Sequence, residues 1–313
     1  MTNQCNIKKA MPDMPLVSIM IITYNQVDFI HETLISALEQ DYKNLEVVVA
    51  DDGSTDGTDK IILQYAEQYP GRLVPVVGGP NLGITGNCNR ALKACNGVYV
   101  ALQGGDDTLL PNKISKQIEW FSQNESAVLC GHKLYVINSI SEVTGTHTMK
   151  KVAGYGVSKW LKYGTLYGGT SIMVKNKHIP KYGFDDRIST SSDWKFYIDV
   201  IKSDKNYYGY VDEYLACYRI HENNITKDKI RTMKDVEITL DILSSEFSSD
   251  KFSLRIGKAY ILHYGKGYQC IEKGKYRESI PFLLESIKLW PLQLKAYVRL
   301  LQASLLIFND RFR

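Results

Sequence analysis

The chain has 313 residues, of which 44% are hydrophobic, and it carries a formal net charge of +4 at pH 7. This length suits about two domains, and the apolar content is ordinary for a protein that buries a sizeable core. A net charge of +4 is too small to indicate nucleic-acid binding. No apolar run reaches the roughly 20 residues that a membrane-spanning helix needs.

The cysteines and the first residues are typical of a protein of the reducing cytosol. The cysteines show neither the spacing of a zinc site nor a disulfide framework, so free thiols are the simplest interpretation. They stand at Cys5, Cys88, Cys95, Cys130, Cys217 and Cys270. The start of the chain lacks the apolar core of a signal peptide, and we expect a flexible tail over residues 1–14.

The first predicted strand is the apolar run 17–23, which we expect to be buried on both faces. Apolar residues at helical spacing follow from Asp28 to Leu38 and predict a helix. A second buried strand, around 47–49, ends on Asp51 and Asp52. The capping residues at 54–56 then predict the start of another helix.

A third strand is predicted around residues 73–77, and the glycine-rich loop 78–86 leads into a helix at about Thr85. A fourth strand, 98–102, is followed by Asp106 and Asp107. Strands that alternate with helices predict an α/β fold with a mostly parallel central sheet and helices on both faces.

Polar side chains therefore follow three strands, at residues 23–25, 51–52 and 106–107. Parallel strands bring such ends to one edge of a sheet, where ligands of open α/β sheets bind. One acidic pair alone is weak evidence for a ligand site, because turns favour aspartate for structural reasons. Asp52 fits a purely structural role in the turn equally well. Two acidic pairs together with Tyr24 indicate a ligand site.

Four motifs, in this order along the chain, resemble the donor-binding half of a family 2 glycosyltransferase with the GT-A fold. They lie at residues 17–25, 49–58, 81–89 and 97–107. The resemblance covers roughly the first two-thirds of the chain. It implies a GT-A nucleotide-diphospho-sugar transferase fold of the kind that bacteria use in polysaccharide synthesis.

The resemblance also implies a pocket for the nucleotide base. Thr23, Tyr24 and Asn25 would line it, with Tyr24 packed against the base. Asp51 would accept a hydrogen bond from the ring N–H of uracil or from the equivalent group of another base. Asp52 would only hold the turn.

For the second acidic pair, the resemblance implies that Asp106 contacts the ribose and that Asp107 binds Mn²⁺ or Mg²⁺ on the donor diphosphate. Many family members carry one more carboxylate here, where this chain has Gly104. The helix-entry motif, which lies earlier in the chain, often reads Ala-Arg-Asn in the family, but residues 87–89 here read Asn-Cys-Asn, so this arginine is also missing. Other residues would have to replace both.

Further along, residues 167–174 read as a turn that leads into a strand lining the site. Asp193 follows Ser191 and Ser192, either of which can cap a helix that begins there. In the family, an aspartate at this place is the catalytic base. The sequence alone equally allows Asp193 to be an ordinary residue of a helix start.

Residues 214–226 resemble the end of the family's catalytic domain, which often reads Tyr-Arg-x-His. By this resemblance, Arg219 would support a carboxylate or a phosphate, because its planar fork suits both. His221 would touch the diphosphate or the metal ion. The alternative is that His221 is an ordinary polar residue at a strand end.

We therefore expect a tail (1–14), a GT-A catalytic domain (15–226) and a C-terminal helical region (227–313). Small residues around Gly267 and Gly274 have the spacing of one tetratricopeptide-like helix pair, although a simple helical hairpin fits as well. The last helix, 292–308, mixes leucines with cations. It could pack inward, form a homodimer or rest on an anionic membrane surface.

The expected activity is that of an inverting glycosyltransferase of the hexosyl or N-acetylhexosaminyl type. It would use a metal-assisted single displacement to move a sugar from a nucleotide diphosphate, most simply UDP, to a saccharide or lipid-linked saccharide. We expect it in the cytoplasm of a bacterium, either free or in peripheral contact with the inner face of the cell membrane. Two alternatives are a degenerate nucleotide-sugar-binding scaffold and a sugar-1-phosphate nucleotidylyltransferase. The latter would need a glycine-rich basic motif where this chain has residues 23–26.

Overall fold

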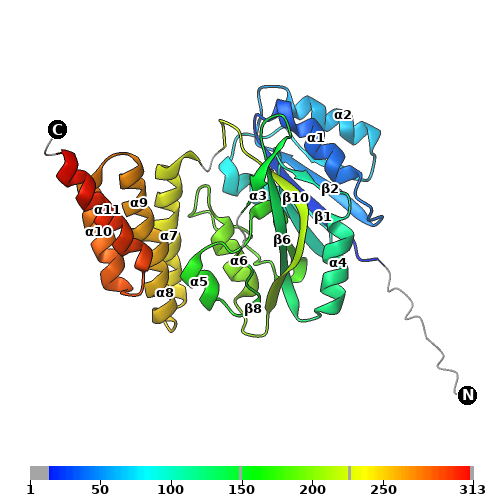
Figure 1. Cartoon of the computed structure of the whole chain (residues 1–313). Coiled ribbons are helices and arrows are strands. Elements are labelled where there is room, and N and C mark those ends of the chain that lie inside the picture. The colour runs from blue at the N-terminus through cyan, green and yellow to red at the C-terminus, as the bar shows by residue number, and fades with distance from the viewer. Residues whose placement is uncertain (1–13, 148–149, 225–226, 311–313) are drawn as a thin grey trace, which may run out of the picture.

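The structure is a computed structural model that describes residues 14–147, 150–224 and 227–310. It places an α/β domain beside a group of C-terminal helices (Figure 1). The tail expected at residues 1–14 lies outside the described residues, apart from Met14.

The sheet runs in the order β3-β2-β1-β4-β9-β6-β10-β5. Its first four strands are parallel, namely β1 (Val17–Thr23), β2 (Leu45–Asp51), β3 (Leu73–Val76) and β4 (Tyr99–Gly104). Thr23 pairs with Asp51, and Ile22 pairs with Gly104. This register brings the three polar strand ends to one edge, as the sequence predicts.

The second half of the sheet is mixed. The short strand β9 (Met173–Lys175) runs antiparallel between β4 and β6 (Ala127–Ile137), whereas β10 (Tyr207–Arg219) is parallel to β6. The short strands β5 (Thr108–Leu109), β7 (Val143–Thr146) and β8 (Gly154–Tyr155) complete the sheet. The prediction of a mostly parallel sheet thus fits the first half better than the second.

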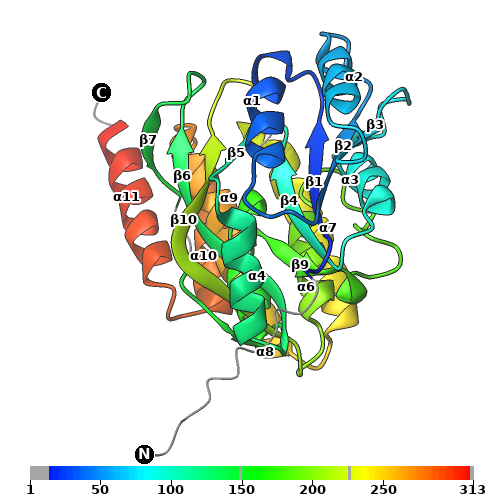
Figure 2. The same cartoon turned by 90° about the vertical axis from the view of Figure 1, so that its right-hand side faces the viewer.

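Helices cover both faces of the sheet (Figure 2). One face is packed by α1 (Val27–Leu38), α2 (Thr58–Gln68) and α4 (Lys113–Gln123), and the other by α3 (Gly83–Ala94), α5 (Ser158–Tyr163) and α6 (Asp193–Ile201). Two short helical turns, η1 (Gly169–Ser171) and η2 (Asn176–His178), flank β9. The predicted α/β architecture is confirmed, with α3 starting two residues before the predicted Thr85.

The C-terminal region is helical, as predicted. It consists of α7 (Lys229–Glu246), α8 (Lys251–Gly257), a π-type segment η4 (Lys258–His263), α9 (Tyr264–Glu272), α10 (Tyr276–Leu289) and α11 (Leu294–Asp310). Leu240 and Leu254 of α7 and α8 belong to the same core as Trp160 of α5. The later helices have a small core of their own, built around Leu283 and Ala296.

Close packing between α8 and α5 depends on Gly257. A Cβ atom at this position would lie 2.1 Å from the backbone oxygen of Leu161, which cannot move without shifting α5. We expect Gly257→Ala to lower the free energy of unfolding by about 1–3 kcal/mol, the usual cost of overpacking a core. Urea unfolding measures this change.

The matched control is Gly265→Ala in α9, where the nearest side-chain atom is the flexible Cε of Met233 at 3.1 Å. Alanine favours a helix over glycine by up to about 1 kcal/mol, so this variant should be neutral or slightly more stable. Equal losses in both variants would contradict the specific role of Gly257.

Candidate functional site

The turns that follow β1 and β2 are joined to each other by hydrogen bonds. The backbone N–H of Asn25 donates to Ser54 Oγ at 2.8 Å, and the Asn25 side-chain oxygen accepts from the N–H of Thr55 at 2.9 Å. Asn25 has a positive φ of 51°, a conformation that asparagine adopts more readily than most residues. Tyr24 is left 48% exposed beside the buried Thr23.

The two adjacent carboxylates after β2 are both buried, and each receives hydrogen-bond donors. Asp51 accepts from the backbone N–H of Ser54 at 2.9 Å and also from its hydroxyl. Asp52 accepts from the N–H of Leu82 at 2.8 Å. These donors offset the repulsion that two neighbouring carboxylates would otherwise suffer.

Arg90 supplies the positive charge of this part of the site, and the sequence analysis missed it. Its guanidinium lies 3.6 Å from the Asp52 carboxylate and donates to the backbone oxygen of Asp51. It also donates to the Asn87 side-chain oxygen at 2.9 Å. Arg90 directly follows the motif in which the expected arginine is absent, so its position one turn from Asn87 was the available signal.

The second acidic pair divides into an inward and an outward carboxylate. Asp107 is buried, and its two oxygens accept from Thr170 Oγ1 and, at 2.9 Å, from the backbone N–H of Arg219. Burial, together with the neighbouring charge of Asp106, raises the pKa of Asp107 well above its ordinary value. Asp106 is partly exposed, and its Oδ2 lies 2.8 Å from His221 Nε2.

Arg219 is fully buried, and its guanidinium is almost completely used within the protein. Nε donates to the backbone oxygen of Asp106 at 2.7 Å, and Nη2 pairs with Glu32 at 2.6 Å. Nη1 donates to Asn138 O at 3.1 Å and Ser141 Oγ at 2.9 Å. The guanidinium therefore supports the turn that carries the acidic pair. Neither Glu32 nor Ser141 gave a signal in the sequence.

Asp193 is the first residue of α6 and is only partly buried. Its Oδ1 accepts from the N–H of Trp194 at 2.9 Å, and burial raises the pKa of its carboxyl above the ordinary value. Ser192 occupies the N-cap position, but the predicted capping bond is absent. Its hydroxyl instead accepts from Thr85 Oγ1 of α3 at 2.9 Å.

Helix α3 links the base-pocket side of the site to Asp193. Burial raises the pKa of Cys88 in this helix to about 12, and the carboxylates of Asp193 and Asp52 add to the effect because both lie near the thiol. Asn87 of the same helix donates to Ala50 O of β2 at 2.9 Å. The start of α3 thus stands between Asp52 and Asp193, which the sequence separates by more than a hundred residues.

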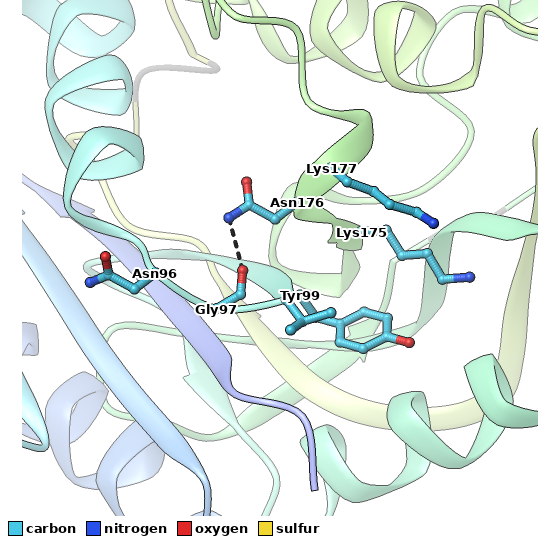
Figure 3. A pocket seen from close by; sticks show the side chains of 7 residues that line it. Asn96, Gly97, Tyr99, Lys175, Asn176 and Lys177 are labelled. Carbon is cyan, nitrogen blue, oxygen red and sulfur yellow. Dashed lines mark hydrogen bonds between the residues drawn. The ribbon is translucent and has the colours of Figure 1, made fainter. Parts of the chain in front are cut away.

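A different hollow lies at the opposite, amino-terminal end of β4 (Figure 3). It is lined by Asn96, Gly97, Val98, Tyr99, Lys175, Asn176 and Lys177. Asn176 closes part of it by donating to Gly97 O at 2.8 Å. None of the predicted site residues lines this hollow, so we place the candidate site at the carboxyl ends of the strands.

Comparison with known proteins identifies the family of the chain. The family model for "Glycosyl transferase family 2" matches residues 18–179. The chain is 31% identical over 226 residues to the UDP-Glc:alpha-D-GlcNAc-diphosphoundecaprenol beta-1,3-glucosyltransferase WfaP of Escherichia coli, covering 70% of this chain and 83% of that protein.

Two solved structures resemble the whole described fold. TarS 1–349 of S. aureus in complex with UDP has a TM-score of 0.62 at 16% identity, covering 92% of this chain and 88% of that one. The mannosyltransferase PcManGT of Pyrobaculum calidifontis, in complex with GDP-Man and Mn²⁺, has a TM-score of 0.57 at 17% identity, covering 94% and 85%. At such identities the likeness concerns the fold alone, and it confirms the GT-A prediction.

The bonding of Arg219 predicts a large effect of even a conservative change. Lysine keeps the charge but cannot reach the acceptors that surround the guanidinium. We expect Arg219→Lys to lower the free energy of unfolding by about 2 kcal/mol or more, because buried acceptors lose their donors. The control Glu32→Gln keeps an acceptor oxygen on a half-exposed side chain. It should change the free energy of unfolding by less than about 1 kcal/mol. Urea unfolding measures the free energy of unfolding of both variants. Equal losses in the two would contradict the bonding role given to Arg219.

Proposed function

The chain belongs to glycosyltransferase family 2, and we propose that it is an inverting enzyme that uses a UDP-sugar donor and a saccharide or lipid-linked saccharide acceptor. The observation that carries the proposal is the position of Asp193. This carboxyl is partly exposed at the start of α6, and α3 connects it to the acidic turn after β2. A catalytic base and a nucleotide pocket at the same edge of the sheet suit glycosyl transfer.

For the donor, we propose that the base packs on Tyr24 between Thr23, Asn25 and Asp51. The exposed ring of Tyr24 offers a flat apolar surface, and the hydrogen bonds between the two turns hold it in place. Asp51 would exchange part of its bonding to Ser54 for the ring N–H of uracil. The complexes of TarS with UDP and with UDP-GlcNAc support a uridine donor.

For the cation, we propose that Asp106 and His221 are the outward-facing ligands, with Asp107 behind them. Asp106 Oδ2 and His221 Nε2 already converge at 2.8 Å, and an imidazole beside a carboxylate suits Mn²⁺ better than Mg²⁺. Among the residues that the structure describes, no group of three or more His, Cys, Asp or Glu side chains is placed to hold an ion. Phosphate oxygens of the donor would complete the shell. When bound, the cation would neutralise charge on the leaving diphosphate.

This arrangement also suggests roles for the remaining predicted residues. Arg219 supports the Asp106–Asp107 turn instead of reaching the phosphates, because its donors are engaged. The contact with His221 favours Asp106 as a metal ligand over the ribose contact that the resemblance implies. Arg90, whose guanidinium lies 3.6 Å from the Asp52 carboxylate, would take the place of the missing motif arginine.

The reaction follows from these positions as a single displacement. The Asp193 carboxylate takes the proton of an acceptor hydroxyl, and the freed oxygen forms a bond to the anomeric carbon. The bond from that carbon to the diphosphate breaks on the opposite face, and the nucleoside diphosphate leaves with the electron pair. The anomeric configuration is therefore inverted.

The acceptor class comes from the relatives. The name of WfaP specifies a glucosyl transfer to a diphosphoundecaprenol-linked sugar, which is a lipid-linked acceptor. We propose an acceptor of this class, used in the synthesis of a bacterial envelope polysaccharide on the cytoplasmic side of the membrane.

The exposed face of α11 supports contact with that membrane. Its outer row is unusually apolar, and its members are 56–72% exposed: Leu294, Val298, Leu301, Leu305 and Phe308. Ala296 and Ala303 face the other way, into the small core of the last helices. No helix within the described residues is long and apolar enough to cross a membrane. We therefore propose that α11 lies on the membrane surface, with Lys288 and Lys295 beside it.

The base assignment predicts that Asp193→Asn lowers kcat by about 10²–10⁴-fold while nucleotide-sugar affinity stays near normal. Transfer from a panel of nucleotide sugars gives kcat, and thermal shift with UDP-sugars and Mn²⁺ gives binding. The control Asp186→Asn changes an aspartate of the exposed turn before α6 and should keep its turnover.

Turnover near normal in Asp193→Asn would show that another residue is the base. If the unchanged protein binds nucleotide sugars but neither transfers nor hydrolyses any sugar of the panel, the degenerate scaffold is favoured instead. The carboxylate missing at Gly104 is consistent with that alternative.

The membrane proposal predicts that the full chain sediments with anionic liposomes and that Leu301→Glu with Leu305→Glu abolishes this. Both side chains are exposed, so folding should persist, and a thermal melt checks it. The control is Leu63→Glu, which makes the same change at an exposed leucine of α2 in the α/β domain. If the unchanged protein stays in the supernatant and light scattering shows a dimer that the double variant lacks, the row joins two copies and the membrane proposal is wrong.

A further inference from the structure

A single carboxylate of the C-terminal region holds the loop that leads into Asp193. Asp235 of α7 accepts from the backbone N–H groups of Thr190 and Ser191, both at 2.9 Å, and from that of Ser189 at 3.4 Å. The hydroxyls of Ser189, at 3.2 Å, and Thr190 donate to it as well. Five donors from three consecutive residues thus converge on one side chain.

The environment of Asp235 favours the charged form. The side chain is buried, with 2% of its surface exposed. Burial acts to raise the pKa of Asp235, but the hydrogen bonds from Thr190, Ser191 and Ser189 outweigh it, and the pKa is lowered. The carboxylate is therefore a fixed negative charge under the loop, in a place where an uncharged side chain could not satisfy all the donors.

The start of α6 needs such an anchor. Ser192 at its N-cap makes no capping bond, because its hydroxyl faces Thr85. Within the described part of the chain, the Asp193 carboxyl accepts hydrogen bonds only from the backbone N–H groups of Trp194 and of Asp193 itself. With no cap of its own, the position of the first turn is set by the residues just before it, and Asp235 fixes three of these.

A second contact of α7, this one with α6 itself, lies about three turns further along α7. Lys195 Nζ pairs with Asp199 at 2.6 Å and with Glu246, the last residue of α7, at 3.0 Å. Helix α7 therefore holds α6 through Glu246 and the three residues before its N-cap through Asp235.

We propose that Asp235 is a positioning residue for the catalytic base, so that the C-terminal helical region forms part of the active site's scaffold. This inference rests on the proposed role of Asp193. A base must be placed to within a fraction of an ångström, and a displacement of about 1 Å can cost roughly 10²-fold in rate. Asp235 reaches the reaction only through the loop, and it touches neither donor nor acceptor.

The test compares Asp235→Asn with Asp241→Asn in the full chain. Asparagine preserves the shape of Asp235 but offers one acceptor oxygen in place of two, so part of the loop loses its partner. Asp241 lies on the same helix and is exposed. We expect kcat of Asp235→Asn to fall by about 10–10²-fold, with the KM for the donor nearly unchanged, whereas Asp241→Asn behaves like the unchanged protein.

The pH profile separates positioning from a general loss of stability. Burial raises the pKa of Asp193, so the acid limb of kcat/KM lies above the ordinary range of an aspartate. A loosened loop admits water to this carboxyl, its pKa falls towards the ordinary value, and the limb moves to lower pH. A merely structural role would lower the amount of folded enzyme and leave the limb in place.

Hydrogen exchange tests the contact without relying on catalysis. The backbone amides of Thr190 and Ser191 should exchange faster in Asp235→Asn than in the unchanged protein. In Asp241→Asn their exchange rates should stay the same. If Asp235→Asn fails to fold, the milder pair Ser189→Ala with Thr190→Val removes only the hydroxyl donors and should shift the limb in the same direction by a smaller amount.

An unchanged kcat and acid limb in a folded Asp235→Asn would overturn the inference. If the amides loosen while the limb stays in place, Asp235 holds the loop but does not position the base, which also overturns it. Failure of the proposed function gives a different result, because Asp193→Asn would then retain its turnover.

Discussion

Buried carboxylates at the carboxyl ends of the strands must each receive hydrogen-bond donors, and this requirement determines how distant parts of the chain are joined. A carboxylate removed from water costs several kcal/mol unless donors replace the lost hydration. Asp52 takes its donor from the loop before α3, and Asp107 takes its donors from η1 and β10. Asp235 takes five from the loop before α6. Each acid is therefore also a cross-link.

The same requirement separates the carboxylates by role. Asp107 has both oxygens occupied and a raised pKa, which suits a residue that shapes the site from behind. Asp106 and Asp193 are partly exposed and have free bonding capacity, so they can respond to a substrate. Arg219 makes this division possible, because it fixes the turn between the inward and the outward member of the pair.

Local sequence pattern predicts the acids but not their partners. The apolar runs before Asp51 and Asp106 have the period of buried strands, and the structure contains those strands. Thr170 lies in the segment 167–174, which the sequence does predict beside the site, but its bond to Asp107 depends on the folded topology. Glu32 comes from a helix whose own pattern gives no reason to place it at the site. The capping bond expected from Ser192 fails for the same reason: a long-range partner on α3 competes for its hydroxyl. Arg90 could have been found, because a cation one turn from Asn87 faces the acidic turn.

Packing continues across the boundary at 226/227 that the sequence suggests. Leu240 and Leu254 share a core with the sheet, and Asp235 of α7 accepts hydrogen bonds from the loop before α6. Helices α7 and α8 therefore pack as part of the α/β domain. The helices after η4 have a separate core and turn an apolar row outward. A segment that contributes little to the central core is free to contact other surfaces, and the border between the two cores lies at the π-type segment η4.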